Sequence, residues 1–218
     1  MATTVSVTRS REFTYVGCGA FGKRVIELMA ELAGASGTRT TEEAGAALAT
    51  DAGLVVVALW RPDLDLCEQA DSAAYRIGRA WLPIVMEHPV IYVGPLVRPP
   101  YGPCFTCMWR RRVQHDVHHA ATSAVHTAYA ADQDRGPVGY LPQHARMAAG
   151  IAHRMLRQPG APDSGGSGVS SDVSVLMLPG SGIMTRPVIR CGDCCRCRGA
   201  EQAEPSAITG ISLVGQPR

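Results

Sequence analysis

The chain has 218 residues, 46% of them hydrophobic, and a formal net charge of +2. This length and apolar content are enough to bury a sizeable core, and a charge near zero gives no strong field that would attract nucleic acid. No apolar run approaches the roughly 20 residues of a membrane span, and the N-terminus lacks the apolar segment of a secretory signal. We therefore expect a cytoplasmic protein with reduced thiols that binds neither nucleic acid nor membrane.

The first half of the chain alternates short apolar runs with helix-like patterns, after a polar N-terminus at 1–11 that we expect to be disordered. Four apolar runs are expected to be strands: 12–16, 53–60, 81–86 and 90–97. The run at 53–60 is continuous and rich in valine, which is typical of a strand buried on both faces of a parallel sheet. Apolar residues at helical spacing after the first run and over 64–79 predict helices. Such helices would connect parallel strands by right-handed crossovers. The expected class is α/β, with a Rossmann-like, parallel-containing sheet flanked by helices.

A G-x-G-x-x-G pattern, Gly17, Gly19 and Gly22, follows the first predicted strand and precedes a helix. In a dinucleotide site the first glycine makes the turn, the second admits a phosphate, and the third lets helix and strand pack closely. Such a site also needs an acidic residue after a second strand, whereas residues 34–45 are polar and rich in glycine. Two interpretations stay open: a nucleotide site formed by these glycines and Lys23, or glycines that serve tight packing alone.

Residues 105–132 contain neither glycine nor proline, and they predict one long helix. Its first turns carry Arg110, Arg111 and Arg112, which either clamp a phosphate or an acidic peptide or simply face solvent. Four histidines share roughly one side of this helix, and we expect them to face solvent or an interface: His115, His118, His119 and His126.

The last third of the chain predicts a helix, a hairpin and a tail. An apolar stripe over 142–157 predicts a helix, and 158–172, rich in Pro, Gly, Ser and Asp, predicts a flexible loop. Two apolar runs at 173–178 and 183–189 surround a glycine-rich turn, which is typical of a β-hairpin. The polar residues 200–218 are expected to be disordered.

Six of the eight cysteines lie in two short segments. Cys104 and Cys107 form one C-x-x-C, and the second segment offers two, Cys191/Cys194 and Cys194/Cys197. Two such knuckles supply the four soft ligands of a closed tetrahedral zinc site, which this compartment favours over disulfides or an iron–sulfur cluster. The other two cysteines are expected in the core: Cys18 and Cys67.

Several motifs together resemble a known family. They are the glycine turn, the runs 54–62 and 93–97, the first cysteine knuckle with the arginines 110–112, and the closing hairpin and knuckle. Over roughly residues 12–199 the chain resembles the ThiF-like proteins that accompany YcaO cyclodehydratases in azoline- and azole-forming ribosomal peptide pathways. These are relatives of the ubiquitin-activating and ThiF/MoeB adenylating enzymes.

The resemblance implies a structural Zn²⁺ held by Cys104, Cys107, Cys194 and Cys197. On that register Cys191 takes the place of a family histidine, and Cys191/Cys194 is the alternative second pair. The set of residues that surrounds ATP in adenylating members has no match on this chain, so ATP is a doubtful cofactor.

The resemblance also implies an accessory role rather than catalysis. The chain is expected to bind a precursor or leader peptide, through the arginines 110–112 among others, to dock a YcaO-type enzyme, and to form a homodimer. The alternative is an enzyme in its own right, either a nucleotide-using ThiF-like adenylating enzyme or an NAD(P)-dependent oxidoreductase that uses the glycine turn.

Overall fold

The computed structural model describes the following residues: 13–33, 38–40, 53–132, 134–157, 171–180 and 182–197. The termini at 1–11 and 200–218, for which we predicted disorder, lie outside them, as do Glu12 and residues 198–199 at the ends of the predicted domain. In the described part of the chain, no helix has the length and apolar character needed to cross a membrane.

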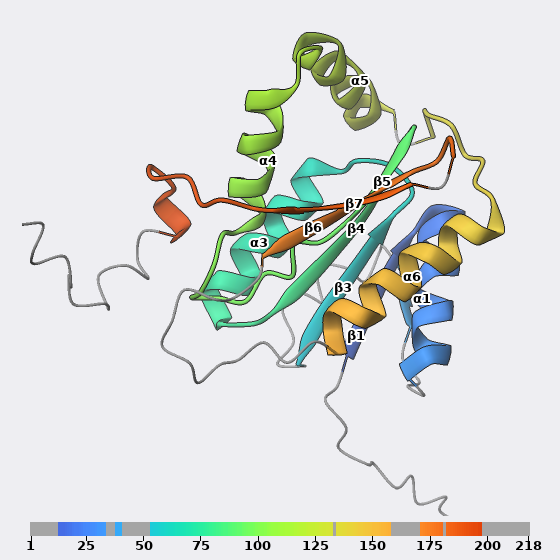
Figure 1. The fold of residues 1–218 in the computed structure, drawn as a ribbon, viewed down its shortest axis with the longest axis horizontal. Coiled ribbons are helices and arrows are strands. Elements are labelled where there is room, and N and C mark those ends of the chain that lie inside the picture. The colour runs from blue at the N-terminus through green and yellow to red at the C-terminus, as the bar shows by residue number, and fades with distance from the viewer. Residues whose placement is uncertain are drawn as a thin grey trace, which may run out of the picture.

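Seven strands in the described residues form one open sheet, in the order β2-β1-β3-β4-β5-β6-β7 (Figure 1). Their bounds are β1 (Phe13–Cys18), β2 (Thr38–Thr40), β3 (Leu54–Leu59), β4 (Trp81–Glu87), β5 (Val90–Val93), β6 (Asp172–Met177) and β7 (Ile183–Pro187). The first four pair in parallel and the last three pair antiparallel. The predicted parallel component is confirmed, and β4 and β5 join as an antiparallel hairpin.

Helices cover both faces of this sheet. Their bounds are α1 (Gly19–Ala33), α3 (Leu64–Ile77), α4 (Phe105–His115), α5 (His119–Ala131) and α6 (Pro142–Arg157). Helices α1 and α6 lie side by side on one face, whereas α3 and α4 lie on the other (Figure 1). The strand order reverses at β1, because β2 pairs on one side of it and β3 on the other.

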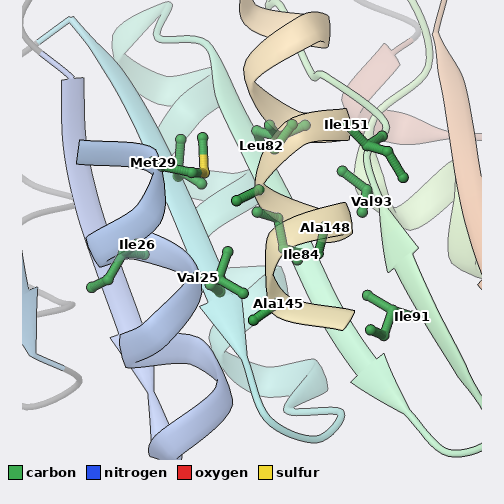
Figure 2. Packing of buried hydrophobic residues seen from close by; sticks show 14 of the residues in the cluster. Val25, Ile26, Met29, Leu82, Ile84, Ile91, Val93, Ala145, Ala148 and Ile151 are labelled. Carbon is green, nitrogen blue, oxygen red and sulfur yellow. The ribbon is translucent and has the colours of Figure 1, made fainter. Parts of the chain in front are cut away.

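Strand β3 is buried on both faces, which explains why its apolar run at 53–60 is continuous. Val56 packs into the layer under α1 and α6, while Val55 and Val57 pack into the layer under α3 and α4. Figure 2 shows the first layer, where side chains of α1, α6, β4 and β5 interlock: Val25, Ile26, Met29, Ala145, Ala148, Ile151, Leu82, Ile84, Ile91 and Val93. Cys18 and Cys67 are buried in the second layer, as predicted.

The single helix predicted over 105–132 is wrong, because α4 ends at His115 and α5 begins at His119. Asp116 causes the break. Its backbone is extended, and its carboxylate accepts hydrogen bonds from the His118 N–H at 2.8 Å and the Thr122 hydroxyl at 2.7 Å. Aspartate competes with a helix in this way by offering its own acceptor to nearby donors.

Other boundaries also differ from the sequence patterns. Strand β5 ends at Val93 because Gly94 adopts a φ of +95°, so the rest of the run predicted over 90–97 leaves the strand. Strand β6 already starts at Asp172, which the sequence assigned to a flexible loop; residues 158–170 lie outside the described residues. The polar stretch 34–45, in which we found no apolar strand, contributes β2 at the sheet edge. The predicted hairpin is confirmed as β6 and β7.

Candidate metal centre

Four cysteines, two from the middle of the chain and two from the end of its described part, meet in one buried cluster. Cys104 is the N-cap of α4 and Cys107 lies in the first turn of that helix. Cys194 and Cys197 come from the last turn of the described chain. Each of the four side chains is at most 3% exposed.

The distances between the sulfur atoms suit a tetrahedral metal. The Sγ of Cys104 lies 3.7 Å from that of Cys107 and 3.6 Å from that of Cys194, and the Sγ of Cys107 lies 3.7 Å from that of Cys197. All four sulfur atoms lie within 4.8 Å of one another. A zinc–sulfur bond of about 2.3 Å places tetrahedral ligands about 3.8 Å apart, whereas a disulfide requires about 2 Å. The cluster is therefore a set of four thiols with the spacing of a closed metal site.

Cys191 lies beside this group without belonging to it. Its backbone N–H donates a hydrogen bond to the Cys107 sulfur at 3.3 Å, and the Tyr75 hydroxyl of α3 lies 3.7 Å from the Cys197 sulfur. The Cys104 thiol donates to Cys107, which lowers the pKa of Cys107 and raises the pKa of Cys104. Such donors stabilise thiolate charge, which is the form of cysteine that binds metal.

Arg196, between the two C-terminal thiols, anchors this turn on α3. Its guanidinium donates to the Asp71 carboxylate at 2.7 Å and to the Thr106 hydroxyl at 2.8 Å, and it pairs with Glu68. Asp71 is fully buried, and it also accepts hydrogen bonds from the Trp81 indole at 3.0 Å and from the Phe105 N–H at 3.1 Å. The hydrogen bond to Glu68 raises the pKa of Arg196 and lowers that of Glu68.

The sequence analysis missed this anchor. The signal available was Asp71 itself, a carboxylate on the face of α3 that carries the buried residues Cys67, Ala70 and Ala74. A buried carboxylate requires a partner, but the pattern of α3 does not reveal that the partner is Arg196, 125 residues away.

The glycine turn is filled by the protein's own atoms. A Cβ on Gly22 would lie 2.2 Å from the Ala58 carbonyl oxygen, and a Cβ on Gly17 would lie 2.6 Å from a methyl carbon of Ile26. Gly19 has a φ of +67°, and a Cβ there would lie 2.3 Å from the Trp60 ring. Helix α1 therefore packs on the sheet at van der Waals contact, and an indole occupies the space beside the second glycine.

The carboxyl ends of β1 and β3, where the strand order reverses, are the usual ligand site of such a sheet. Here the Arg61 guanidinium lies 5.1 Å from the Trp60 ring and 5.2 Å from the Tyr129 ring. It also donates to the backbone carbonyls of Asp132 and Arg135 at 2.9 and 2.8 Å. Lys23 is exposed on α1. The nucleotide site stays a prediction, and the side chains at this edge already have partners within the chain.

The three predicted peptide-binding arginines all contact the chain itself. Arg110 lies 3.2 Å from the Asp193 carboxylate, with its side chain 48% exposed. Arg111 donates to the backbone carbonyls at 189 and 190, at 3.4 and 3.2 Å. Arg112 lies against the rings of Tyr92 and Trp109, at 4.4 and 4.8 Å, and pairs with Glu87. That these arginines bind a peptide stays a prediction. Arg112 already has a structural role through its contacts with Tyr92, Trp109 and Glu87.

The prediction that the four histidines face solvent or an interface is wrong for His126. Its Nε2 lies 2.9 Å from a Glu87 carboxylate oxygen, and its ring lies 5.3 Å from the Trp109 ring. The other three histidines are exposed: His115, His118 and His119. Burial raises the pKa of Glu87, but the hydrogen bonds from His126 and Arg112 outweigh burial and hold that pKa below its usual value.

No protein-family model matches this chain, and no curated protein matches its sequence. Several solved structures share its fold. The heterocyclase TruD aligns over 86% of this chain with a TM-score of 0.58 and 17% identity. A chain of the E. coli microcin synthetase McbBCD complex aligns over 87% with a TM-score of 0.56 and 12% identity, and E. coli MccB bound to MccA over 85% with 0.55 and 11%.

This chain is shorter than the proteins it resembles. It spans 27% of the TruD chain, 71% of the microcin synthetase chain and 66% of MccB. At these identities the likeness defines the class of fold: a mixed α/β sheet, shared with heterocyclases and microcin synthetases, that in this chain carries a cluster of four cysteines.

Proposed function

We propose that this chain is a non-catalytic partner in the biosynthesis of an azoline- or azole-bearing ribosomal peptide. It binds the precursor peptide and docks a YcaO-type cyclodehydratase, which performs the ATP-dependent ring formation. The observation that carries the proposal is the fold likeness to a heterocyclase over 86% of the chain and to a microcin synthetase chain over 87%. One of the similar structures is a heterocyclase in complex with substrate and cofactor, and another is MccB with MccA.

A structural Zn²⁺ belongs to this proposal, with Cys104, Cys107, Cys194 and Cys197 as its ligands. Four thiolates complete a tetrahedral shell and leave no position for a substrate, which favours a structural metal over a catalytic one. When bound, the ion cross-links the start of α4 to the C-terminal turn and so holds the hairpin and the helices in one unit.

A binding role fits the filled edge of the sheet better than a nucleotide-using role does. The space beside Gly19 is taken by Trp60, and Arg61 is engaged by two backbone carbonyls. Lys23, the one lysine of the chain, is exposed on α1. Because the described residues of the glycine turn leave no open phosphate cradle and the one lysine is exposed, neither an adenylating enzyme nor an NAD(P)-dependent oxidoreductase is favoured.

Reconstitution tests the proposal. The genes that neighbour its own are searched for a YcaO-type enzyme and a short Cys/Ser/Thr-rich peptide. The chain is mixed with both, and mass spectrometry follows the loss of one water per ring formed. We expect the chain to co-purify with both and to accelerate ring formation. Absence of binding to either partner, together with unchanged ring formation when the chain is omitted, overturns the proposal. Light scattering on the same sample measures whether the chain forms the expected homodimer.

A further inference from the structure

Strand β7 forms one edge of the sheet and is exposed on both faces. It follows β6 in the strand order and has no neighbour on its other side within the described residues (Figure 1). All five of its residues are exposed, including two large apolar side chains, Ile183 at 47% and Met184 at 42%. An exposed apolar edge is a template for pairing with another strand.

The hydrogen-bond register shows which backbone groups of β7 face outward. The Met177 N–H donates to the Gly182 carbonyl, and the Val188 N–H donates to the Ser171 carbonyl. Because residues of an antiparallel pair alternate between bonding inward and outward, the even-numbered residues of β7 bond to β6. The N–H and C=O groups of Ile183 and Thr185 therefore point away from β6.

The outward-facing edge of β7 is short, and it ends near Pro187. Pro187 has no N–H, so it offers a carbonyl only. The next outward carbonyl, at Ile189, accepts a hydrogen bond from Arg111 at 3.4 Å. The edge can therefore pair with a strand of about five residues centred on Thr185.

A polar cavity of about 50 Å³ lies beside Thr185, on the face of the sheet that α6 covers. Its charged lining consists of Arg98, Arg154 of α6 and Asp172 of β6, which gives two positive charges against one negative charge. The Thr185 hydroxyl forms part of the wall and lies 3.3 Å from the Ser174 hydroxyl. The volume is space for roughly four water molecules or for one carboxylate group.

Strand β7 itself is also basic. From 173 to 192 the chain contains no aspartate or glutamate, while Arg186 of β7 lies within that stretch. The charge complement of this surface is an acidic strand. A side chain paired with Thr185 projects to the same face as Thr185, which places it at the cavity.

We propose that the outer edge of β7 binds an extended acidic peptide as an added strand. The backbone of the peptide pairs with Ile183 and Thr185, and an Asp or Glu side chain opposite Thr185 enters the cavity beside Arg98 and Arg154. This inference rests on the proposed peptide-binding function, because it assigns that function to one edge of the sheet.

The test uses a fluorescein-labelled nine-residue peptide in which serine and valine alternate around one central glutamate. Its control has glutamine at the centre. We expect the glutamate peptide to bind, and the glutamine peptide to bind about tenfold more weakly, because a charge-assisted hydrogen bond is lost. Equal binding of the two peptides, or no binding of either, overturns the proposal.

Two variants test the two parts of the contact. Thr185→Pro removes an outward N–H and leaves the β6 ladder intact, so the peptide affinity should fall about threefold to tenfold while the melting temperature changes little. Arg154→Glu should weaken the glutamate peptide about tenfold, whereas Arg157→Glu, on the same helix but outside the cavity, should not. Equal losses for the two arginine variants indicate general charge attraction and reject the cavity.

The same variants separate this inference from the proposed function. If the natural precursor peptide binds wild type, Thr185→Pro and Arg154→Glu equally, the edge is not the site and the proposed function stands. If it binds none of them, the proposed function fails. If Thr185→Pro turns a dimer into a monomer by light scattering and the designed peptide never binds, a second copy of the chain occupies the edge and the inference is wrong.

Discussion

The guanidinium of Arg196 lies 2.7 Å from the carboxylate of Asp71, a residue that is fully buried on α3 and 125 positions earlier in the chain. This ion pair places the C-terminal turn against α3 and brings two thiols to the start of α4. The charge of Asp71 is tolerated in the core because Arg196, Trp81 and the Phe105 N–H all donate to it.

Replacing Arg196 should be strongly destabilising. Arg196→Met leaves the buried Asp71 without its countercharge, so we expect the free energy of unfolding to fall by about 3–5 kcal/mol in a urea titration. The matched control is Arg110→Met, which removes an exposed pair with Asp193 and should cost less than about 1 kcal/mol. Equal costs for the two variants would show that the Arg196–Asp71 pair contributes no more than a surface pair.

The metal site predicts a specific pattern among cysteine variants. Purified protein should contain about one zinc ion per chain by elemental analysis, and Cys104→Ser or Cys197→Ser should lose it. Cys195→Ser is the control, because Cys195 is exposed and outside the group. Cys191→Ser decides the second pair: retained zinc supports Cys194 and Cys197, whereas lost zinc supports the alternative Cys191/Cys194.

Removing the metal should also lower stability. A chelator should lower the melting temperature by roughly 10 °C or more, because structural zinc sites contribute several kcal/mol to folding. Re-addition of zinc under reducing conditions should restore the original value. An unchanged melting temperature after complete zinc removal would contradict a structural role for the metal.

Two glycine-to-alanine substitutions, one in the glycine turn and one on α6, should have opposite effects on stability. Gly22→Ala forces a Cβ to within 2.2 Å of the Ala58 carbonyl oxygen, so we expect a loss of about 1–3 kcal/mol in unfolding free energy. Gly150→Ala on α6 meets no atom within 4 Å and should stabilise the protein by up to about 1 kcal/mol. Calorimetry on both variants checks the prediction, and a neutral Gly22→Ala would disprove the close packing.

The packing of the glycine turn predicts that nucleotides do not raise the melting temperature of the protein. Because Trp60 fills the space beside Gly19, we expect no rise in melting temperature with millimolar ATP, NAD or NADP. A clear rise that Lys23→Ala abolishes would instead restore the nucleotide interpretation.

The lowered pKa of Glu87 predicts how the free energy of unfolding changes with pH. Its pKa is lowered in the folded state, so its contribution is fully present above about pH 4.5 and is lost as the pH falls through the folded-state pKa. Glu87→Gln should therefore cost about 1–3 kcal/mol at pH 7, and the difference from wild type should shrink toward acidic pH. Glu31→Gln, at an exposed site, should show almost no difference at any pH. A pH-independent difference for Glu87→Gln would reject the ionic contribution.

The sequence by itself determined the elements whose signal is local. The valine run of β3 and the apolar stripe of α6 each have a period or a composition that only one conformation buries well. The hairpin is marked by the glycine-rich turn between its two apolar runs. The C-x-x-C at Cys104 and Cys107 likewise places two thiols on one turn wherever that turn lies. The class of fold and half of the candidate metal site follow from such patterns.

The tertiary structure alone decided everything that depends on distant residues meeting. The pairing of β5 with β6, the partner of Asp71 and the choice of sulfur atoms beside Cys107 arise from contacts between segments far apart in the chain. Trp60 beside Gly19 is the clearest case, because the glycine pattern of a phosphate cradle and that of close packing are identical in sequence. Only the position of the indole ring distinguishes them, and that position is a product of the folded chain.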